Sequence, residues 1–195
     1  MVNSYLFYEK DSCFFVKENR GDGMKRIMIV GVSSGVGKST FARKLGKLLQ
    51  KPVYHLDALF WKPNWIQASL EEFTEAQQRI VTEGEWIIEG NYNNTFDIRT
   101  TYADTIIYLQ FPLHVCLYRV FERFVMNIGR TRSDLGGGCK EKLDWLFLKF
   151  IWTKYYPRKE NMPRKLAEFH ANNQDKTVIL LKNKQEIASY LENIK

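Results

Sequence analysis

Cysteine is scarce in this chain of 195 residues, and long apolar runs are missing. The three cysteines, Cys13, Cys116 and Cys139, are odd in number and far apart, and none stands in a CxxC or Cys/His spacing typical of zinc sites. We therefore expect reduced thiols and a cytoplasmic protein, because disulfides are rare in the cytosol. No apolar run approaches the ~20 residues of a membrane-spanning helix, so no membrane partner is expected.

A signal-peptide pattern is also missing, because the first 23 residues lack a basic start followed by a proper apolar core. Met24, Lys25 and Arg26 then lead directly into a short apolar run. The sequence predicts that the fold starts at Met24, and that residues 1–23 are an N-terminal extension, an extra edge strand or the result of a mis-called translation start. It predicts residues 24–195 as one domain of ordinary size, without repeats or low-complexity linkers.

The net charge of +7 is concentrated in one part of the chain. Residues 119–165 hold twelve basic and five acidic side chains, so this segment accounts for the whole excess. A local basic segment indicates an anionic partner, such as nucleotide phosphates, nucleic acid or a membrane surface. A solvated surface is the alternative, and composition leaves both open.

Short apolar runs alternate with helix-like periodic segments along the chain. The strand-like runs are residues 26–30, 53–56, 85–89, 104–110 and 176–181, and the helix-like segments include 39–50, 69–81, 113–128 and 183–194. Strands that are apolar throughout are typical of a sheet buried on both faces, which is a parallel sheet. The order predicts an α/β fold with a doubly wound, five-stranded parallel sheet.

Residues 141–156 form a segment that is apolar on nearly every side of a helix. Such a helix is expected to be buried on several sides, in the core or in a subdomain. A homodimer contact or the wall of a hydrophobic cleft are alternatives.

The strongest motif is GVSSGVGKST at residues 31–40, which ends in Gly-Lys-Ser as a phosphate-binding P-loop (Walker A) does. The usual first glycine, five residues before Gly37, is Val32 here, while Gly31 lies one place earlier. A strand precedes the motif and an amphipathic helix follows it, which favours a P-loop over a chance match. We expect Val32→Gly to be tolerated, since it restores the usual pattern.

A P-loop binds phosphates with inward-facing backbone N–H groups, helped by the dipole of the next helix. Its lysine contacts the β- and γ-phosphates, and its Ser/Thr hydroxyl holds Mg²⁺. Lys38 and Ser39 match these two roles, so ATP and Mg²⁺ are the expected cofactors. The expected ATP-binding residues are Ser34, Gly35, Val36, Gly37, Lys38, Ser39 and Thr40.

Two carboxylates follow strand-like runs, at the edge of the sheet where ligands bind in parallel folds. Glu89 ends the third strand and can orient the water shell of Mg²⁺, with an ordinary strand-end acid as the alternative. Asp57 follows the second strand and can bind an acceptor hydroxyl or act as its general base, with a helix cap as the alternative. A phosphate acceptor would need no base, because its oxygen is already ionised. His55 has no expected partner and is interpreted as structural.

Arginines gather after the fourth strand. Arg119 and Arg123 share one helix face, and Arg130 and Arg132 follow near the helix end. Guanidinium groups that close on a transferring phosphoryl group stabilise its charge, so these four are candidate catalytic residues of a helical lid at about residues 119–165. The glycines at 136–138 can act as its hinge. Helix solvation is the alternative reading.

The aromatic side chains Phe60, Trp61 and Trp65 follow the second strand. They can sandwich a flat ring of the substrate or pack under a loop, and the sequence leaves both open.

Taken in order, these segments resemble the adenylate kinase-like nucleoside and nucleotide kinases. More closely, the chain is similar to the bacterial proteins known as DNA topology modulation proteins, which share that kinase fold. The matching segments span about residues 24–156 and are GVSSGVGKSTFARKLG, YHLDALFWKPNW, WIIEGNYNNTFDIR, ADTIIYLQFP with CLYRVFER, and GRTRSD before GCKEK. In adenylate kinases an Asp-Gly ends the third strand, where this chain has Glu89-Gly90. The resemblance implies that Arg99 grips the phosphate of the acceptor.

The predicted function is ATP- and Mg²⁺-dependent phosphoryl transfer to a small acceptor, a nucleoside or a nucleotide, selected by Asp57, Arg99 and Trp61. No guanine-reading NKxD tetrapeptide occurs, which argues against a GTPase. One alternative is a DNA-associated regulator that uses the P-loop as a switch, although no DNA-binding signature supports it. The other is a P-loop ATPase without an acceptor.

Overall fold

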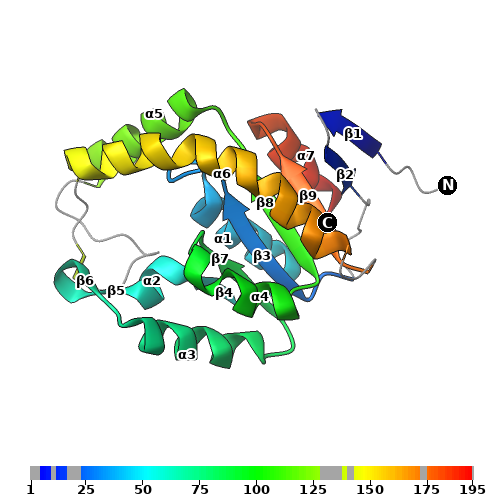
Figure 1. Cartoon of the computed structure of the whole chain (residues 1–195), viewed down its shortest axis with the longest axis horizontal. Coiled ribbons are helices and arrows are strands. Elements are labelled where there is room, and N and C mark those ends of the chain that lie inside the picture. Colours follow the sequence, from blue (N-terminus) through cyan, green and yellow to red (C-terminus); the bar gives the residue numbers. More distant parts are fainter. Residues whose placement is uncertain are drawn as a thin grey trace.

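Five parallel strands form the centre of the molecule in the order β4-β7-β3-β8-β9 (Figure 1). The computed structural model describes residues 5–9, 12–16, 23–127, 138–139, 143–171 and 175–194. The strands are β3 (Arg26–Gly31), β4 (Val53–His55), β7 (Trp86–Glu89), β8 (Thr105–Leu109) and β9 (Thr177–Leu181). This confirms the predicted doubly wound sheet, and each strand lies within two residues of its expected bounds.

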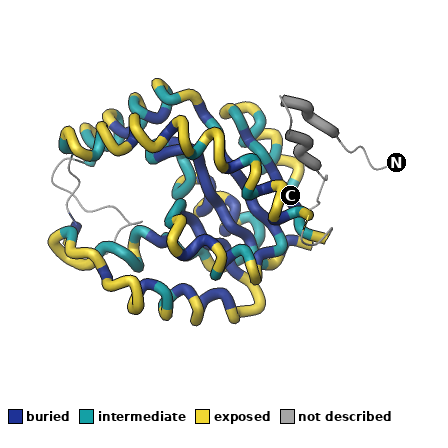
Figure 2. The backbone as a smooth tube through the Cα atoms, in the orientation of Figure 1, coloured by how far each residue is buried: buried dark blue, intermediate teal, exposed yellow. Residues whose placement is uncertain are grey.

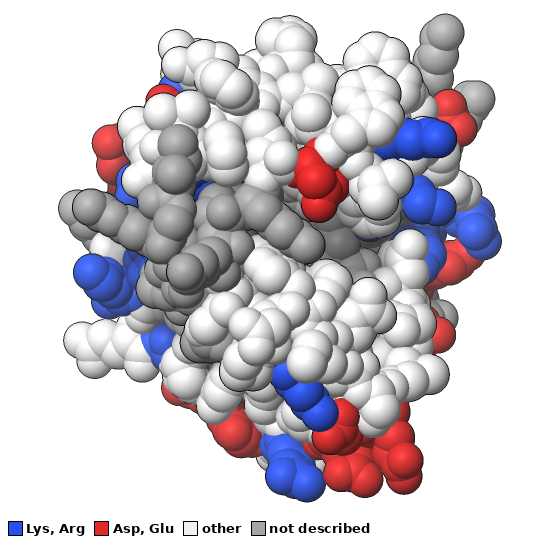
Figure 3. Space-filling view, turned by 90° about the vertical axis from the view of Figure 1, so that its left-hand side faces the viewer, with Lys and Arg blue, Asp and Glu red and all other residues white. Residues whose placement is uncertain are grey.

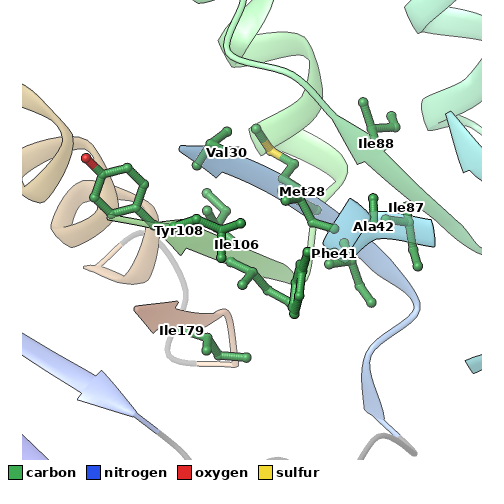
Figure 4. Packing of buried hydrophobic residues seen from close by; sticks show 14 of the residues in the cluster. Met28, Val30, Phe41, Ala42, Ile87, Ile88, Ile106, Tyr108 and Ile179 are labelled. Carbon is green, nitrogen blue, oxygen red and sulfur yellow. The ribbon is translucent and has the colours of Figure 1, made fainter. Parts of the chain in front are cut away.

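The strands are apolar because both faces of the sheet are covered. All four residues of β7 and all five of β8 are buried, as the dark blue strands of Figure 2 show. Figure 4 shows Met28 and Val30 of β3 beside Ile106 and Tyr108 of β8. Phe41 of α1 is part of the same buried cluster. Burial of each such side chain contributes about 1.5–3 kcal/mol, so this core fixes the strand order.

Helices lie on both sides of this sheet. They are α1 (Lys38–Leu49), α2 (Leu56–Phe60), α3 (Leu70–Val81), α4 (Phe96–Tyr102), α5 (Leu113–Met126), α6 (Trp145–Ala171) and α7 (Lys184–Asn193). In Figure 1, α6 runs in front of the sheet and α1 lies behind it. Helix α3 begins with the capping box that Ser69 and Glu72 predict, in which each side chain accepts from the other residue's backbone N–H. The short helices α2 and α4 have no clear period and were not expected.

Helix α6 corrects one expectation. Tyr155 is buried in the core and Ile151 is also buried, but Trp145 and Leu146 are each 75% exposed and Trp152 is 59% exposed. The helix is therefore buried on one side only, and the prediction of burial on several sides is wrong. The C-terminal end of α5 and the N-terminal end of α6 face the viewer in the upper part of Figure 3, where the described surface is mainly uncharged.

The N-terminal extension contains two described strands, β1 (Tyr5–Glu9) and β2 (Ser12–Val16). They pair antiparallel in a sheet of their own, and β2 lies beside β9 and α6. The two described strands of the extension therefore form a sheet separate from the main one. Within the described ranges, no helix is long and apolar enough to cross a bilayer.

Candidate nucleotide-binding site

The loop between β3 and α1 lies at the carboxyl edge of the sheet. After β3 the chain first builds one side of the sheet, with β4 and β7, and then the other side, with β8 and β9, so the loop lies at the topological switch point. Gly35 has a φ of 78° and Gly37 a φ of 102°, which are left-handed values that glycine adopts at little cost. Val32 is fully buried, and its N–H donates to the Leu109 carbonyl at 2.9 Å. The departure from the usual motif thus places a core side chain at the start of the loop.

Helix α1 presents its N-terminus to this loop. Its N-cap residue is Gly37, which offers no side-chain hydrogen bond, and its first turn contains no acidic residue. The first backbone N–H groups of a helix have no partner within it and carry a partial positive charge. The loop and helix together therefore form a site suited to an anion such as a phosphate.

Helix α5 packs directly on the loop. A Cβ added at Gly35 would lie 2.2 Å from the Cys116 carbonyl oxygen, so only glycine fits there. The Arg119 guanidinium donates to the Val36 carbonyl at 2.9 Å and lies 4.6 Å from the ring centre of Phe111. Burial also raises the pKa of the Cys116 thiol to about 11, which keeps it protonated at neutral pH. Arg119 thus contacts the loop and supports its shape, and its catalytic role stays a prediction.

A buried carboxylate faces the first turn of α1. Glu89 is 4% exposed, and its Oε2 accepts from the Ser39 hydroxyl at 3.1 Å. Lys38 Nζ lies 4.0 Å from Glu89 Oε1 and donates to the Ser33 carbonyl at 3.3 Å. The His55 Nδ1 lies 2.9 Å from Glu89 Oε2. Sequence reasoning brought Lys38, Ser39 and Glu89 together but missed His55.

The position of His55 has a simple cause. His55 ends β4 and pairs in register with Glu89 at the end of the parallel strand β7. Paired residues on adjacent strands project to the same face of the sheet, so the two side chains meet. Register is a tertiary property, and only an assumed β4-β7 pairing would have indicated this contact.

The donors at this position fit Mg²⁺ in the way P-loop proteins use it. Ser39 and Glu89 supply a hydroxyl and a carboxylate oxygen, and Mg²⁺ prefers oxygen ligands. In the described part of the chain, no group of three or more His, Cys, Asp or Glu side chains could hold a metal by itself. The remaining ligands would therefore have to be water and nucleotide phosphates.

Asp57 lies in the first turn of α2, directly after β4. Its Oδ1 accepts from the Tyr92 hydroxyl at 2.7 Å. The Tyr92 ring packs against Phe60 and Phe73 with centroid distances of 4.9 and 4.8 Å, which fixes the direction of its hydroxyl. Burial, followed by the nearby Asp57 charge, raises the pKa of Tyr92, so its hydroxyl keeps the proton that it donates.

Of the predicted substrate residues, Arg99 does not face this position. Arg99 is fully buried, and its guanidinium donates to the carbonyls of Gly90 at 2.9 Å and Tyr92 at 2.7 Å. Burial lowers its pKa to about 10, which still leaves it charged at neutral pH. Trp61 packs edge-on against Phe60 and hydrogen-bonds to Tyr92, the partner of Asp57, so its role toward a substrate stays a prediction. The expectation that Arg99 grips a phosphate has no support in this arrangement.

A single cleft of about 730 Å³ collects most of the candidate residues. Asp57, Glu89, Arg119 and Arg123 line it together with the loop, and α7 closes it at one side. The lining residues of the loop are Ser34, Gly35, Val36, Gly37, Lys38, Ser39 and Thr40, and those of α7 are Lys184, Ile187, Ala188 and Leu191. Arg130 and Arg132, like most of the expected hinge at 136–138, lie outside the described residues.

Comparisons with known proteins agree with the fold. No family model and no curated protein matches the chain. Among solved structures, a gluconokinase from Sinorhizobium meliloti 1021 matches with a TM-score of 0.51 and 15% identity, over 90% of this chain and 91% of that chain. A shikimate kinase from Acinetobacter baumannii, in complex with shikimate, matches with a TM-score of 0.50 and 15% identity, over 88% and 90%. The chain therefore shares the α/β fold of these two structures.

Proposed function

We propose that this protein is an ATP- and Mg²⁺-dependent kinase of a small acceptor, a nucleoside or a nucleotide. The observation that carries the proposal is the meeting of three elements at one cleft. A loop with two left-handed glycines leads into an uncapped helix, and the first residues of that helix, Lys38 and Ser39, face the buried Glu89. Nucleotide phosphates are negatively charged, which suits the N–H groups of the helix terminus and the cation of Lys38. Their oxygen atoms would also complete the ligand set of Mg²⁺.

The cleft residues divide the work of phosphoryl transfer. Residues 34–40 bind the phosphates, and Lys38 neutralises the charge between the β- and γ-phosphates. Ser39 would hold Mg²⁺ directly and Glu89 would hold it through water, and the ion would supply positive charge that offsets the charge of the phosphates. Arg119 and Arg123 line the cleft from α5 and stabilise the transferring group. We assign the same role to Arg130 and Arg132, which adjoin α5 in sequence.

The test compares two lysines of the same helix. Lys38→Ala should lower ATP turnover at least about 100-fold, because it removes the cation beside the transferring phosphate. Lys47→Ala, at an exposed position of α1 outside the cleft, should retain turnover. ADP release in a coupled assay over nucleosides, nucleoside monophosphates and sugars measures turnover, and circular dichroism checks the fold. Wild-type activity in Lys38→Ala would refute the phosphate site.

The other roles remain outcomes of the same assays. ATP hydrolysis without stimulation by any acceptor would favour a P-loop ATPase. DNA binding that falls steeply with salt would favour a regulator related to the DNA topology modulation proteins, a role motivated by the charge of residues 119–165. A cytoplasmic location and a homodimer stay predictions, which fractionation and sedimentation would test.

A further inference from the structure

We infer that the acceptor of this kinase presents a hydroxyl group, which Asp57 deprotonates, and not a phosphate group. The inference rests on the proposed kinase function and names the chemical class of its second substrate. Three observations support it: the distribution of charge in the cleft, the position of Arg99, and the contact between Asp57 and Tyr92.

Cations are absent from the strand-end side of the cleft among the described lining residues. Among the described lining residues, every cation comes from the loop, α1, α5 or α7, and the set is Lys38, Arg43, Lys44, Arg119, Arg123 and Lys184. The carboxylates Asp57 and Glu89 lie at the ends of β4 and β7, while a third lining carboxylate, Glu122, belongs to α5 on the cationic side. The cationic part suits the polyphosphate of ATP. An acceptor that approaches along β4 and β7 meets carboxylates, which repel a phosphate and accept hydrogen bonds from hydroxyl groups.

Arg99 is committed to the main chain of residues 90–95. Its guanidinium donates to the Gly90 and Tyr92 carbonyls and is fully buried. Turning it toward a ligand would leave two carbonyls without their donor, and buried carbonyls in proteins are nearly always paired. Arg99 therefore holds the segment that carries Tyr92, and it does not face the acceptor.

Tyr92 and Asp57 form the orienting contact that a general base needs. The 2.7 Å hydrogen bond fixes one carboxylate oxygen, and the aromatic packing of Tyr92 fixes the donor. Asp57 lines the same cleft as Lys38 and Ser39, which flank the expected γ-phosphate. A phosphate acceptor is already ionised and has no use for such a base, whereas a hydroxyl has.

The chemical step is balanced by ATP and the acceptor alone. The acceptor O–H proton passes to the Asp57 carboxylate as the oxygen attacks the γ-phosphorus. A new O–P bond forms while the bond between that phosphorus and the β–γ bridging oxygen breaks. ADP leaves with the bonding pair, and Asp57 returns its proton to water. Tyr92 touches no reacting atom and is a positioning residue.

The nature of the new bond tests the inference directly. The enzyme is incubated with MgATP and a pool of nucleosides, sugars and polyols, or with a pool of nucleoside monophosphates, and ³¹P NMR identifies the product. A phosphate monoester from the first pool is expected. A phosphoanhydride from the second pool, formed equally well by Asp57→Asn, would overturn the inference and leave the kinase function intact.

Variants then assign the roles. Asp57→Asn should lower turnover with hydroxyl acceptors by about 10²–10⁴-fold without changing ATP affinity. The matched control Asp97→Asn, on the exposed side of α4, should behave as wild type. Tyr92→Phe keeps the ring and should lower kcat about tenfold with KM unchanged. An unchanged kcat would remove the positioning role.

ATP hydrolysis tests the role of Asp57 without a known acceptor, because water then takes the place of the acceptor. Slow hydrolysis of ATP transfers the phosphoryl group to a hydroxyl, so Asp57→Asn should lower that rate as well. Unchanged hydrolysis in this variant would overturn the role of Asp57. Failure of the protein to bind MgATP at all would instead refute the proposed kinase function.

Discussion

Gly35→Ala is the substitution that most directly tests how the phosphate loop is built. The Cβ of alanine would lie 2.2 Å from the Cys116 carbonyl oxygen and 2.8 Å from Val120 Cγ2. Both atoms belong to α5, and real Cβ contacts essentially never come this close. The loop or the helix must therefore move.

The cost follows from two terms. A left-handed φ of 78° costs a non-glycine residue about 1–2 kcal/mol, and overpacking in a dense region typically costs about 1–3 kcal/mol. Together they lower the free energy of unfolding by about 2–5 kcal/mol. For a domain of this size, that corresponds to a fall in Tm of roughly 4–20 °C.

The position also couples stability to binding. Moving α5 away from the loop would stretch the 2.9 Å hydrogen bond between Arg119 and the Val36 carbonyl. ATP affinity should therefore fall even in the fraction of Gly35→Ala that is folded. Urea denaturation and titration with a fluorescent ATP analogue measure the two effects separately.

Gly84→Ala provides the matched control. A Cβ at Gly84 meets nothing within 4 Å, and no left-handed φ is recorded there. Its stability should change by less than about 0.5 kcal/mol. If Gly35→Ala were as stable as Gly84→Ala and bound ATP normally, α5 would not pack on the loop as described, and the reasoning would fail.

Two further substitutions test the surroundings of the loop. The sequence predicted that Val32→Gly is tolerated, but the Val32 side chain is buried. The variant should therefore lose about 2–4 kcal/mol of stability, from lost apolar burial and added chain entropy in the unfolded state, while the folded fraction still binds ATP. Calorimetry with ATP titration measures both effects. His55→Leu removes one of the partners of Glu89 and should weaken Mg²⁺-dependent nucleotide binding about tenfold, whereas His55→Asn keeps an N–H donor and should largely restore it. Equal Mg²⁺ titrations for both His55 variants would show that the contact does not position Glu89.

The sheet and the loop could be predicted because their signals are local. Apolar runs without alternation require cover on both faces, which indicates parallel strands and places their carboxyl ends at one edge. The spacing of Gly35, Gly37 and Lys38 predicts the backbone conformation of the loop, and this prediction needs no knowledge of tertiary contacts. The same reasoning located Glu89 and Asp57, because both follow strands.

Helix α6 was misjudged for a physical reason. Periodicity reveals which residues of a helix are apolar, and it does not reveal whether a neighbour covers them. Trp145 and Trp152 are as apolar as Ile151, yet of these three only Ile151 is buried. Burial depends on what packs opposite, which is a property of the whole chain.

Local sequence by itself determined which edge of the sheet carries the site and which residues reach it from the strand ends. Tertiary structure decided how those residues act. Register between β4 and β7 placed His55 on Glu89, the packing of α5 made Arg119 a support of the loop, and the carbonyls of residues 90–95 withdrew Arg99 into the interior. Side-chain roles depend on contacts between segments distant in sequence, and such contacts exist only once the chain has folded.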